Sequence, residues 1–211
     1  MVAIIDYGLS NLLSIKRAVS LYTHEVEIVN APDELMKADK IILPGVGAFH
    51  YGMDCLMRLG LKDVVKEKVW SGTPLMGICL GMQMLFDEGD EGGLYEGLGF
   101  IPGRVEKIPE EDVWGNKQNV PHIGWEKLIL NKEATVSGDI LKGISPEYEY
   151  YFVHSYEGKT KSRRYCLAGI DYGGRTVCAI VQNDNVIGCQ FHPEKSGEMG
   201  LKMISNFVLE L

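Results

Sequence analysis

The chain has 211 residues, of which 45% are hydrophobic and 24% are charged, and its net charge is −8. These values predict one soluble globular domain over residues 1–211, and the acidic balance argues against nucleic acid or an anionic membrane as partner. No apolar run approaches the roughly 20 residues of a membrane span, and the N-terminus shows no secretory pattern. The five cysteines include no C-x-x-C pair, so we expect reduced thiols in the cytoplasm, with no disulfide frame and no zinc site.

Apolar runs alternate with helical patterns through the first 87 residues, which predicts a mostly parallel sheet covered by helices on both faces. Ser10 or Asn11 is placed to cap the first helix. The predicted strands are 2–5, 25–29, 40–43 and 73–78, and the predicted helices are 13–21, 33–38, 48–70 and 81–87.

Residues 88–99 are rich in glycine and acidic residues and predict a loop, after which the pattern changes to short antiparallel strands. A turn at 183–185 predicts a hairpin, and a final apolar stripe predicts a C-terminal helix. The predicted strands of this half are 104–108, 125–128, 148–153, 167–172, 176–182 and 186–191, and the helix is 200–209.

Cys79 lies between a predicted strand and a predicted helix, with Gly77 two residues before it and Gly81 two residues after it. This spacing is typical of a nucleophile elbow, in which glycines allow a sharp turn that exposes the reactive side chain. The positive end of the helix dipole favours the thiolate form. Taken alone, such a motif more often marks a buried cysteine that only fills space.

Two further segments complete the candidate site at the carboxyl ends of the predicted strands. Residues 44–47, with two glycines, predict backbone N–H groups for an oxyanion hole near Gly47 and Leu80, or else a plain tight turn. His192 and Glu194, two residues apart in an extended segment, predict an imidazole oriented by a carboxylate, or else a polar hairpin end.

Together these segments predict a Cys79–His192–Glu194 triad that attacks an amide carbonyl, forms a thioester and releases ammonia. His192 protonates the leaving ammonia and then activates water. We expect no metal and no cofactor, because His24, His122 and His154 are scattered along the sequence.

Six stretches resemble the class I (triad) glutamine amidotransferases, and most closely the glutaminase subunits of imidazole glycerol phosphate synthases. They follow the family order over nearly the whole chain. The stretches are IIDYG at 4–8 with Asn11, PGVGAF at 44–49, GICLGMQMLF at 77–86, NVPHIGW at 119–125, YFVHSY at 151–156 and QFHPEKS at 190–196.

The resemblance implies the class I amidotransferase α/β fold, a mostly parallel sheet flanked by helices with additional antiparallel strands. It implies hydrolysis of L-glutamine, with ammonia channelled to a (β/α)8-barrel cyclase in a heterodimer that makes imidazole glycerol phosphate and AICAR in histidine biosynthesis. The residues it assigns are catalytic Cys79, His192 and Glu194, oxyanion-forming Gly47 and Leu80, substrate-binding Gln83, Glu91, Ser155 and Tyr156, and interface residues Asn11, Trp125, Tyr151 and Lys195.

Two residues depart from the usual family pattern in stretches expected near the partner. Ser10 replaces a glycine, and Glu126 stands where the family usually has asparagine. These two departures leave open the alternative that the chain is a paralogous glutaminase, which supplies ammonia to a surface-sugar amidating enzyme. Trp125 fits a half-buried core position as well as an interface. A cysteine peptidase of related fold and a non-catalytic subunit are the rival functions.

Overall fold

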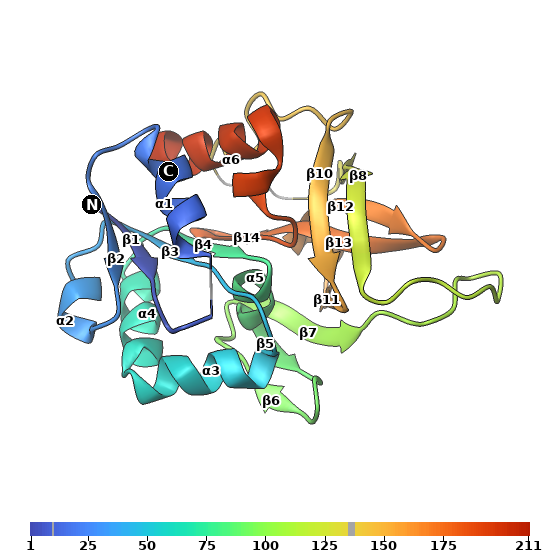
Figure 1. The fold of residues 1–211 in the computed structure, drawn as a ribbon, viewed down its shortest axis with the longest axis horizontal. Helices are drawn as coiled ribbons and strands as arrows, with labels where there is room; N and C mark the ends of the chain where they lie inside the picture. Colours follow the sequence, from blue (N-terminus) through green and yellow to red (C-terminus); the bar gives the residue numbers. More distant parts are fainter. Residues whose placement is uncertain (10, 135–137) are drawn as a thin grey trace.

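The computed structural model describes residues 1–9, 11–134 and 138–211. An eight-stranded sheet runs through its centre in the order β2-β1-β3-β4-β14-β13-β12-β9 (Figure 1). The first five strands in this order are parallel to their neighbours, and the last three are added antiparallel. Their bounds are β1 Val2–Ile5, β2 Val26–Val29, β3 Lys40–Leu43, β4 Leu75–Ile78, β9 Ile129–Leu130, β12 Cys166–Tyr172, β13 Arg175–Asn183 and β14 Val186–Cys189.

Helices cover both faces of the parallel part of the sheet (Figure 1). Alternate residues of each strand face opposite sides. Val2 and Ile4 of β1 therefore pack in the cluster of α1 and α6, while Ala3 and Ile5 pack in the cluster of α3 and α4. The helices are α1 Leu12–Ser20, α2 Pro32–Leu35, α3 Phe49–Arg58, α4 Leu61–Trp70, α5 Leu80–Met84 and α6 Gly197–Glu210, with short 3₁₀ turns η1 Arg163–Tyr165 and η2 Pro193–Lys195.

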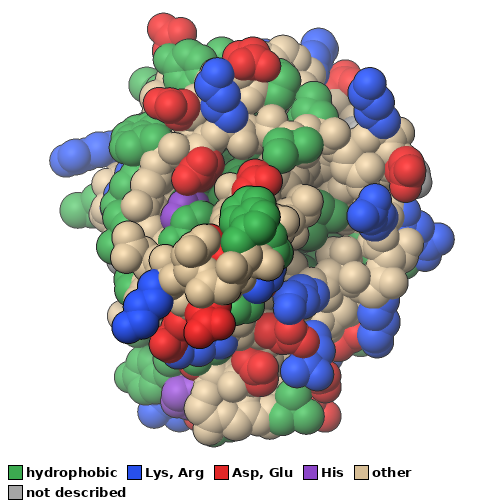
Figure 2. Space-filling view, turned by 90° about the vertical axis from the view of Figure 1, so that its right-hand side faces the viewer, with side chains coloured by type: hydrophobic (Ala, Val, Ile, Leu, Met, Phe, Trp, Pro, Cys, Tyr) green, Lys and Arg blue, Asp and Glu red, His purple; other side chains and the backbone are tan. Residues whose placement is uncertain are grey.

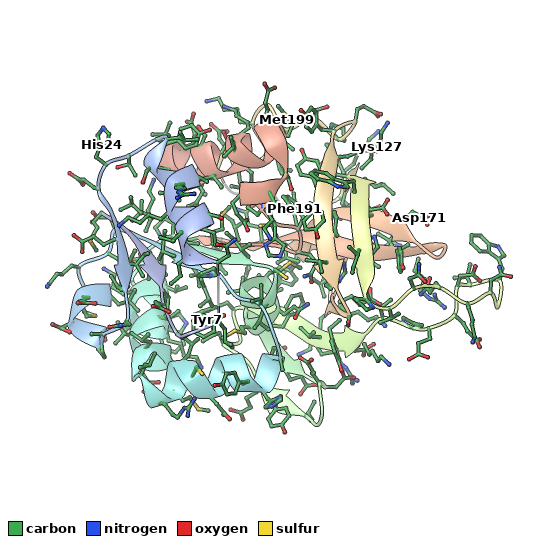
Figure 3. The ribbon with its side chains drawn as sticks, viewed as in Figure 1. Tyr7, His24, Lys127, Asp171, Phe191 and Met199 are labelled. Atoms are coloured by element: carbon green, nitrogen blue, oxygen red, sulfur yellow. The ribbon has the colours of Figure 1, made fainter. Side chains whose placement is uncertain are left out.

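Two smaller sheets lie beside the antiparallel half of the central sheet. One contains β11, β7, β5 and β6, and the other pairs β10 with β8. Figure 3 places Phe191 at the centre of the molecule, and its ring packs against Tyr150 and Phe152 of β10 at 4.7 and 5.6 Å. The strand bounds are β5 Phe86–Gly89, β6 Tyr95–Glu96, β7 Ile101–Lys107, β8 His122–Lys127, β10 Glu149–His154 and β11 Tyr156–Thr160.

The predicted fold class is confirmed, and the predicted strands of the central sheet and the hairpin of β13 and β14 are present. The single helix predicted over 48–70 is wrong, because Gly60 takes φ 69° and divides it into α3 and α4. The prediction of a helix over 81–87 followed by a loop is also wrong. The helix is only α5, and the chain enters β5 at Phe86, whose side chain is fully buried.

The cap prediction for the first helix is wrong for Asn11, which occupies the N-cap position without a side-chain hydrogen bond. Its alternative, Ser10, lies outside the described residues. No helix among the described residues is long and apolar enough to cross a membrane.

Candidate active site

Cys79 occupies a sharp turn between β4 and α5, with φ 54° and ψ −111°. This region is sparsely populated by residues with a side chain, so the surrounding structure must hold it. A Cβ on Gly77 would lie 2.7 Å from the backbone of Gly81, and a Cβ on Gly81 would overlap the carbonyl oxygen of Leu43. Gly77 is therefore required for β4 and α5 to approach closely, and Gly81 is required for α5 to approach the end of β3.

His192 lies directly after the hairpin, beside β10. Its Nδ1 is 2.9 Å from Glu194 Oε1, and the two side chains are only 5% and 1% exposed. The His192 backbone N–H donates to the Tyr151 carbonyl at 3.0 Å, and the Ser196 hydroxyl donates to the His192 carbonyl at 2.7 Å. The main chain on both sides of the ring is thus fixed to β10 and to the start of α6.

Three influences set the pKa of His192. Burial opposes protonation, but interactions with the Cys79 thiol and the Glu194 carboxylate outweigh it and raise the pKa to about 9. No hydrogen bond of normal geometry reaches His192 Nε2 from any described residue. This atom is therefore available to interact with the thiol and with an incoming substrate.

A cavity of about 260 Å³ opens beside Cys79. This size suits a ligand no larger than an amino acid. It brings together Cys79, Gly47 and all four residues predicted to bind substrate. The lining residues are Val46, Gly47, Cys79, Gln83, Glu91, Pro121, Val153, His154, Ser155 and Tyr156.

Backbone donors near the thiol are already engaged in this conformation. Leu80 N–H donates to the Gly45 carbonyl at 3.3 Å, and Val46 N–H donates to the Leu9 carbonyl at 2.7 Å. An oxyanion hole requires N–H groups aimed at the substrate oxygen. Leu80 must therefore be released from Gly45 before it can take the predicted role, and the roles of Gly47 and Leu80 stay predictions.

Gln190 is a buried polar residue of this site to which the sequence pattern assigns no role. Its Nε2 lies 3.7 Å from Cys79 Sγ, and its Oε1 accepts a hydrogen bond from Gln83 Nε2 at 3.0 Å. Gln83 Nε2 also donates to the Tyr156 carbonyl at 3.0 Å. Both donor positions of Gln83 are thus used within the protein, which leaves its Oε1 as the atom to face a substrate.

The sequence model of the family described as glutamine amidotransferase class-I matches residues 3–211. The chain belongs to the class-I glutamine amidotransferases. Its relatives include an "Imidazole glycerol phosphate synthase subunit HisH 1" of Legionella pneumophila (strain Lens), 43% identical over 98% of both chains. The subunit HisH of Geobacillus sp. (strain WCH70) is 45% identical, covering 98% of this chain and 95% of the relative.

Solved structures show the same amidotransferase fold at low sequence identity. A crystal structure described as a glutamine amidotransferase has a TM-score of 0.73 at 19% identity and covers 99% of both chains. The structure of PurLQS from Thermotoga maritima gives a TM-score of 0.69 at 20% identity, covering 99% of this chain and 96% of the other. These likenesses bear on the fold alone.

Three of the four residues that the amidotransferase resemblance assigns to a partner interface lie together. The Trp125 ring is 5.4 Å from that of Tyr151, and Lys195 Nζ is 5.9 Å from the Tyr151 ring. Asn11 is exposed at the start of α1, which contacts η2. Trp125 is 52% exposed, so about half of its side chain is accessible to a partner and its interface role stays a prediction.

Two of the histidines that are scattered along the sequence come together in space. His122 and His154 are buried directly opposite each other in the β8–β10 pair, and His154 lines the cavity. Figure 2 views the molecule from the side that carries these strands, where hydrophobic side chains stand among acidic and basic ones. All five cysteines are free, and no group of three or more metal-ligating side chains occurs among the described residues.

We expect Gly81→Ala to destabilise this amidotransferase by about 2 kcal/mol or more, because the new methyl group would overlap backbone that cannot move freely. Urea unfolding measures the loss. Gly124→Ala is the matched control, since its Cβ would meet only side-chain atoms at ordinary contact distances of 3.7 and 3.8 Å. Equal stability of the two variants would contradict the close approach of β3 to the elbow.

The raised pKa of His192 makes stability depend on pH in a defined direction. Because the folded pKa of about 9 exceeds the ordinary 6.5, the stabilisation is complete below pH 6.5 and is lost as pH rises through 9. The contribution of His192 protonation to the free energy of unfolding is at most about 3 kcal/mol. Comparing the unfolding free energies of the wild type and His192→Asn from pH 6 to 10 should give a difference that shrinks with pH. A difference that grows with pH would contradict this assignment.

Proposed function

We propose that the chain is a glutaminase subunit that converts L-glutamine and water to L-glutamate and ammonia. The observation that carries the proposal is the strained Cys79 beside the His192–Glu194 pair, at the wall of a cavity sized for one amino acid. Gln83, Glu91, Ser155 and Tyr156 at the same cavity provide polar groups for the substrate.

In the proposed mechanism, Cys79 and His192 act as a thiolate–imidazolium pair. The sulfur attacks the side-chain carbonyl of glutamine, and the tetrahedral oxyanion takes its hydrogen bonds from backbone N–H groups near Gly47 and Leu80. His192 passes its proton to the departing nitrogen, so ammonia leaves and a thioester remains. His192 then accepts a proton from water, whose hydroxide attacks the thioester and releases glutamate while the thiolate is restored. Glu194 holds the ring through Nδ1 during both steps.

We further propose that this ammonia is delivered within a heterodimer to a (β/α)8-barrel cyclase of the HisF kind, in the cytoplasm. The cyclase would use it to form imidazole glycerol phosphate and AICAR in histidine biosynthesis. Support comes from the HisH relatives at 41–45% identity over 98% of the chain. The names of these relatives do not favour the alternative of a surface-sugar amidating partner. Asn11, Trp125, Tyr151 and Lys195 are the proposed contact residues.

The N–H groups of Leu80 and Val46 are hydrogen-bonded within the protein, so they are not available to a substrate oxyanion in this conformation. The proposal therefore predicts that the partner must release them. Glutamate release should be slow for the chain alone and should rise at least about tenfold when the cognate cyclase and its nucleotide ligand are added. The same stimulation by an amidating enzyme of surface-sugar synthesis, without any by the cyclase, would contradict the assignment to histidine biosynthesis. Peptide cleavage without glutamate release would contradict the glutaminase.

A further inference from the structure

A chain of hydrogen-bonded groups begins at Glu126 on β8 and passes inward through two histidines. Glu126 Oε1 lies 3.1 Å from His122 Nε2, and His122 Nδ1 lies 3.2 Å from His154 Nε2. His154 Nδ1 is 2.8 Å from the carbonyl oxygen of Tyr156. The Glu126 side chain is 34% exposed, whereas that of His122 is 3% exposed, so the chain leads from the surface into the protein.

The same Tyr156 carbonyl connects the histidines to Cys79. It accepts a second hydrogen bond, from Gln83 Nε2 at 3.0 Å. Gln83 also donates to Gln190, whose Nε2 reaches the sulfur of Cys79. Which group donates in each hydrogen bond along this path therefore affects how Gln83 and the Cys79 thiol are oriented toward a substrate.

Counting protons shows that neutral histidines cannot make all of these bonds. The carboxylate of Glu126 and the carbonyl of Tyr156 only accept, so His122 and His154 must provide every hydrogen of the three bonds between them. Two neutral imidazoles have two N–H groups in total. A third proton is required for the three bonds to exist together.

The surroundings place that proton on His122. Burial lowers the pKa of His154 to about 4, so His154 remains neutral and uses its one N–H toward Tyr156. The titratable groups that face His122 are Glu126 on its own strand, His154 on β10 and Tyr172 on β12, whose ring centroid lies 4.0 Å from that of His122. Glu126 is the one carboxylate of these three groups and therefore the one whose charge can balance an imidazolium.

We propose that His122 and Glu126 are positioning residues for the reaction at Cys79, and that they hold one additional proton as an imidazolium–carboxylate pair. This pair lets His154 keep its N–H on the Tyr156 carbonyl, which in turn anchors Gln83. The inference rests on the proposed glutaminase function for its catalytic consequence and on the hydrogen-bond geometry for the protonation state.

Loss of the additional proton at alkaline pH has a defined result. A neutral His122 that keeps its bond to Glu126 presents a lone pair to His154, which must then donate from Nε2 and release the Tyr156 carbonyl. In Glu126→Gln, the carboxamide can donate to His122 Nε2, so all three bonds form with both rings neutral. The variant removes the need for the proton without removing the chain of bonds.

Nitrogen-15 NMR of the ring nitrogens tests the protonation state directly. At pH 7 the wild type should show two protonated nitrogens on His122 and one on His154. Glu126→Gln should show one on each. Glu149→Gln, a change of an exposed carboxylate on the paired strand β10, should match the wild type. A singly protonated His122 in the wild type would overturn the assignment.

The KM for glutamine provides the functional readout. In the wild type, KM should rise about three- to tenfold as increasing pH removes the proton from His122. This is the range expected for losing one or two net hydrogen bonds. In Glu126→Gln it should stay constant over the same range. Equal pH dependence of KM in both proteins would overturn the positioning role. No glutamate release, with the NMR pattern intact, would overturn the proposed function and the positioning role but leave the proton assignment standing.

Discussion

Replacing Cys79 with alanine should lower glutamate release by at least about 10⁴-fold, because no other group can form the thioester on which both halves of the proposed mechanism depend. Alanine retains a Cβ, so the strained φ of 54° at the elbow is unchanged and the fold should persist. Release is measured by coupled detection of glutamate, with the cyclase and its ligand present.

Two controls make the result of Cys79→Ala specific. Complex formation with the cyclase should be unchanged, since Trp125, Tyr151 and Lys195 lie outside the elbow. Cys55→Ala, a change of another buried free cysteine, should retain glutaminase activity. Normal glutamine hydrolysis by Cys79→Ala would remove Cys79 as the nucleophile.

Replacing Glu194 with glutamine should reduce kcat about 10²- to 10⁴-fold. The buried carboxylate accepts the His192 Nδ1 hydrogen at 2.9 Å and fixes the tautomer that leaves Nε2 for the reaction. A carboxamide can instead turn its N–H₂ group toward Nδ1, which favours the unproductive tautomer.

The pH profile distinguishes this role of Glu194 from a purely structural one. Glu194 is one of the two groups that raise the pKa of His192 to about 9, so the alkaline limb of kcat should move to lower pH in Glu194→Gln. Glu198→Gln, at the exposed start of α6, should behave as the wild type. An unshifted alkaline limb in Glu194→Gln would contradict the direct contact with His192.

Local sequence predicts much of the site because its geometry depends on neighbouring residues. Gly77 and Gly81 mark the turn around Cys79, and the need for Gly77 arises within the turn itself, because its Cβ would lie 2.7 Å from the backbone of Gly81. His192 and Glu194 need only one extended segment to place their side chains together. These short-range constraints are readable without knowing how distant strands pair.

Features that depend on long-range pairing could not be predicted in the same way. The sequence around Phe86 predicts a helix, but Phe86 pairs with Ile101 of β7 and therefore lies in β5. The predicted strands 125–128 and 148–153 both stop short of a histidine, whereas β8 and β10 extend to His122 and His154 and set them opposite each other. The contact between the two rings is therefore a product of strand register.

The central claim is that Cys79 attacks the side-chain carbonyl of glutamine. The most direct measurement is covalent trapping with a glutamine analogue that carries a diazoketone in place of the amide, followed by intact-mass analysis and peptide mapping. We predict one adduct per chain, formed with loss of dinitrogen, on Cys79 alone and prevented by excess glutamine. An active protein that carries the adduct on Cys55, Cys166, Cys178 or Cys189 instead would contradict the account.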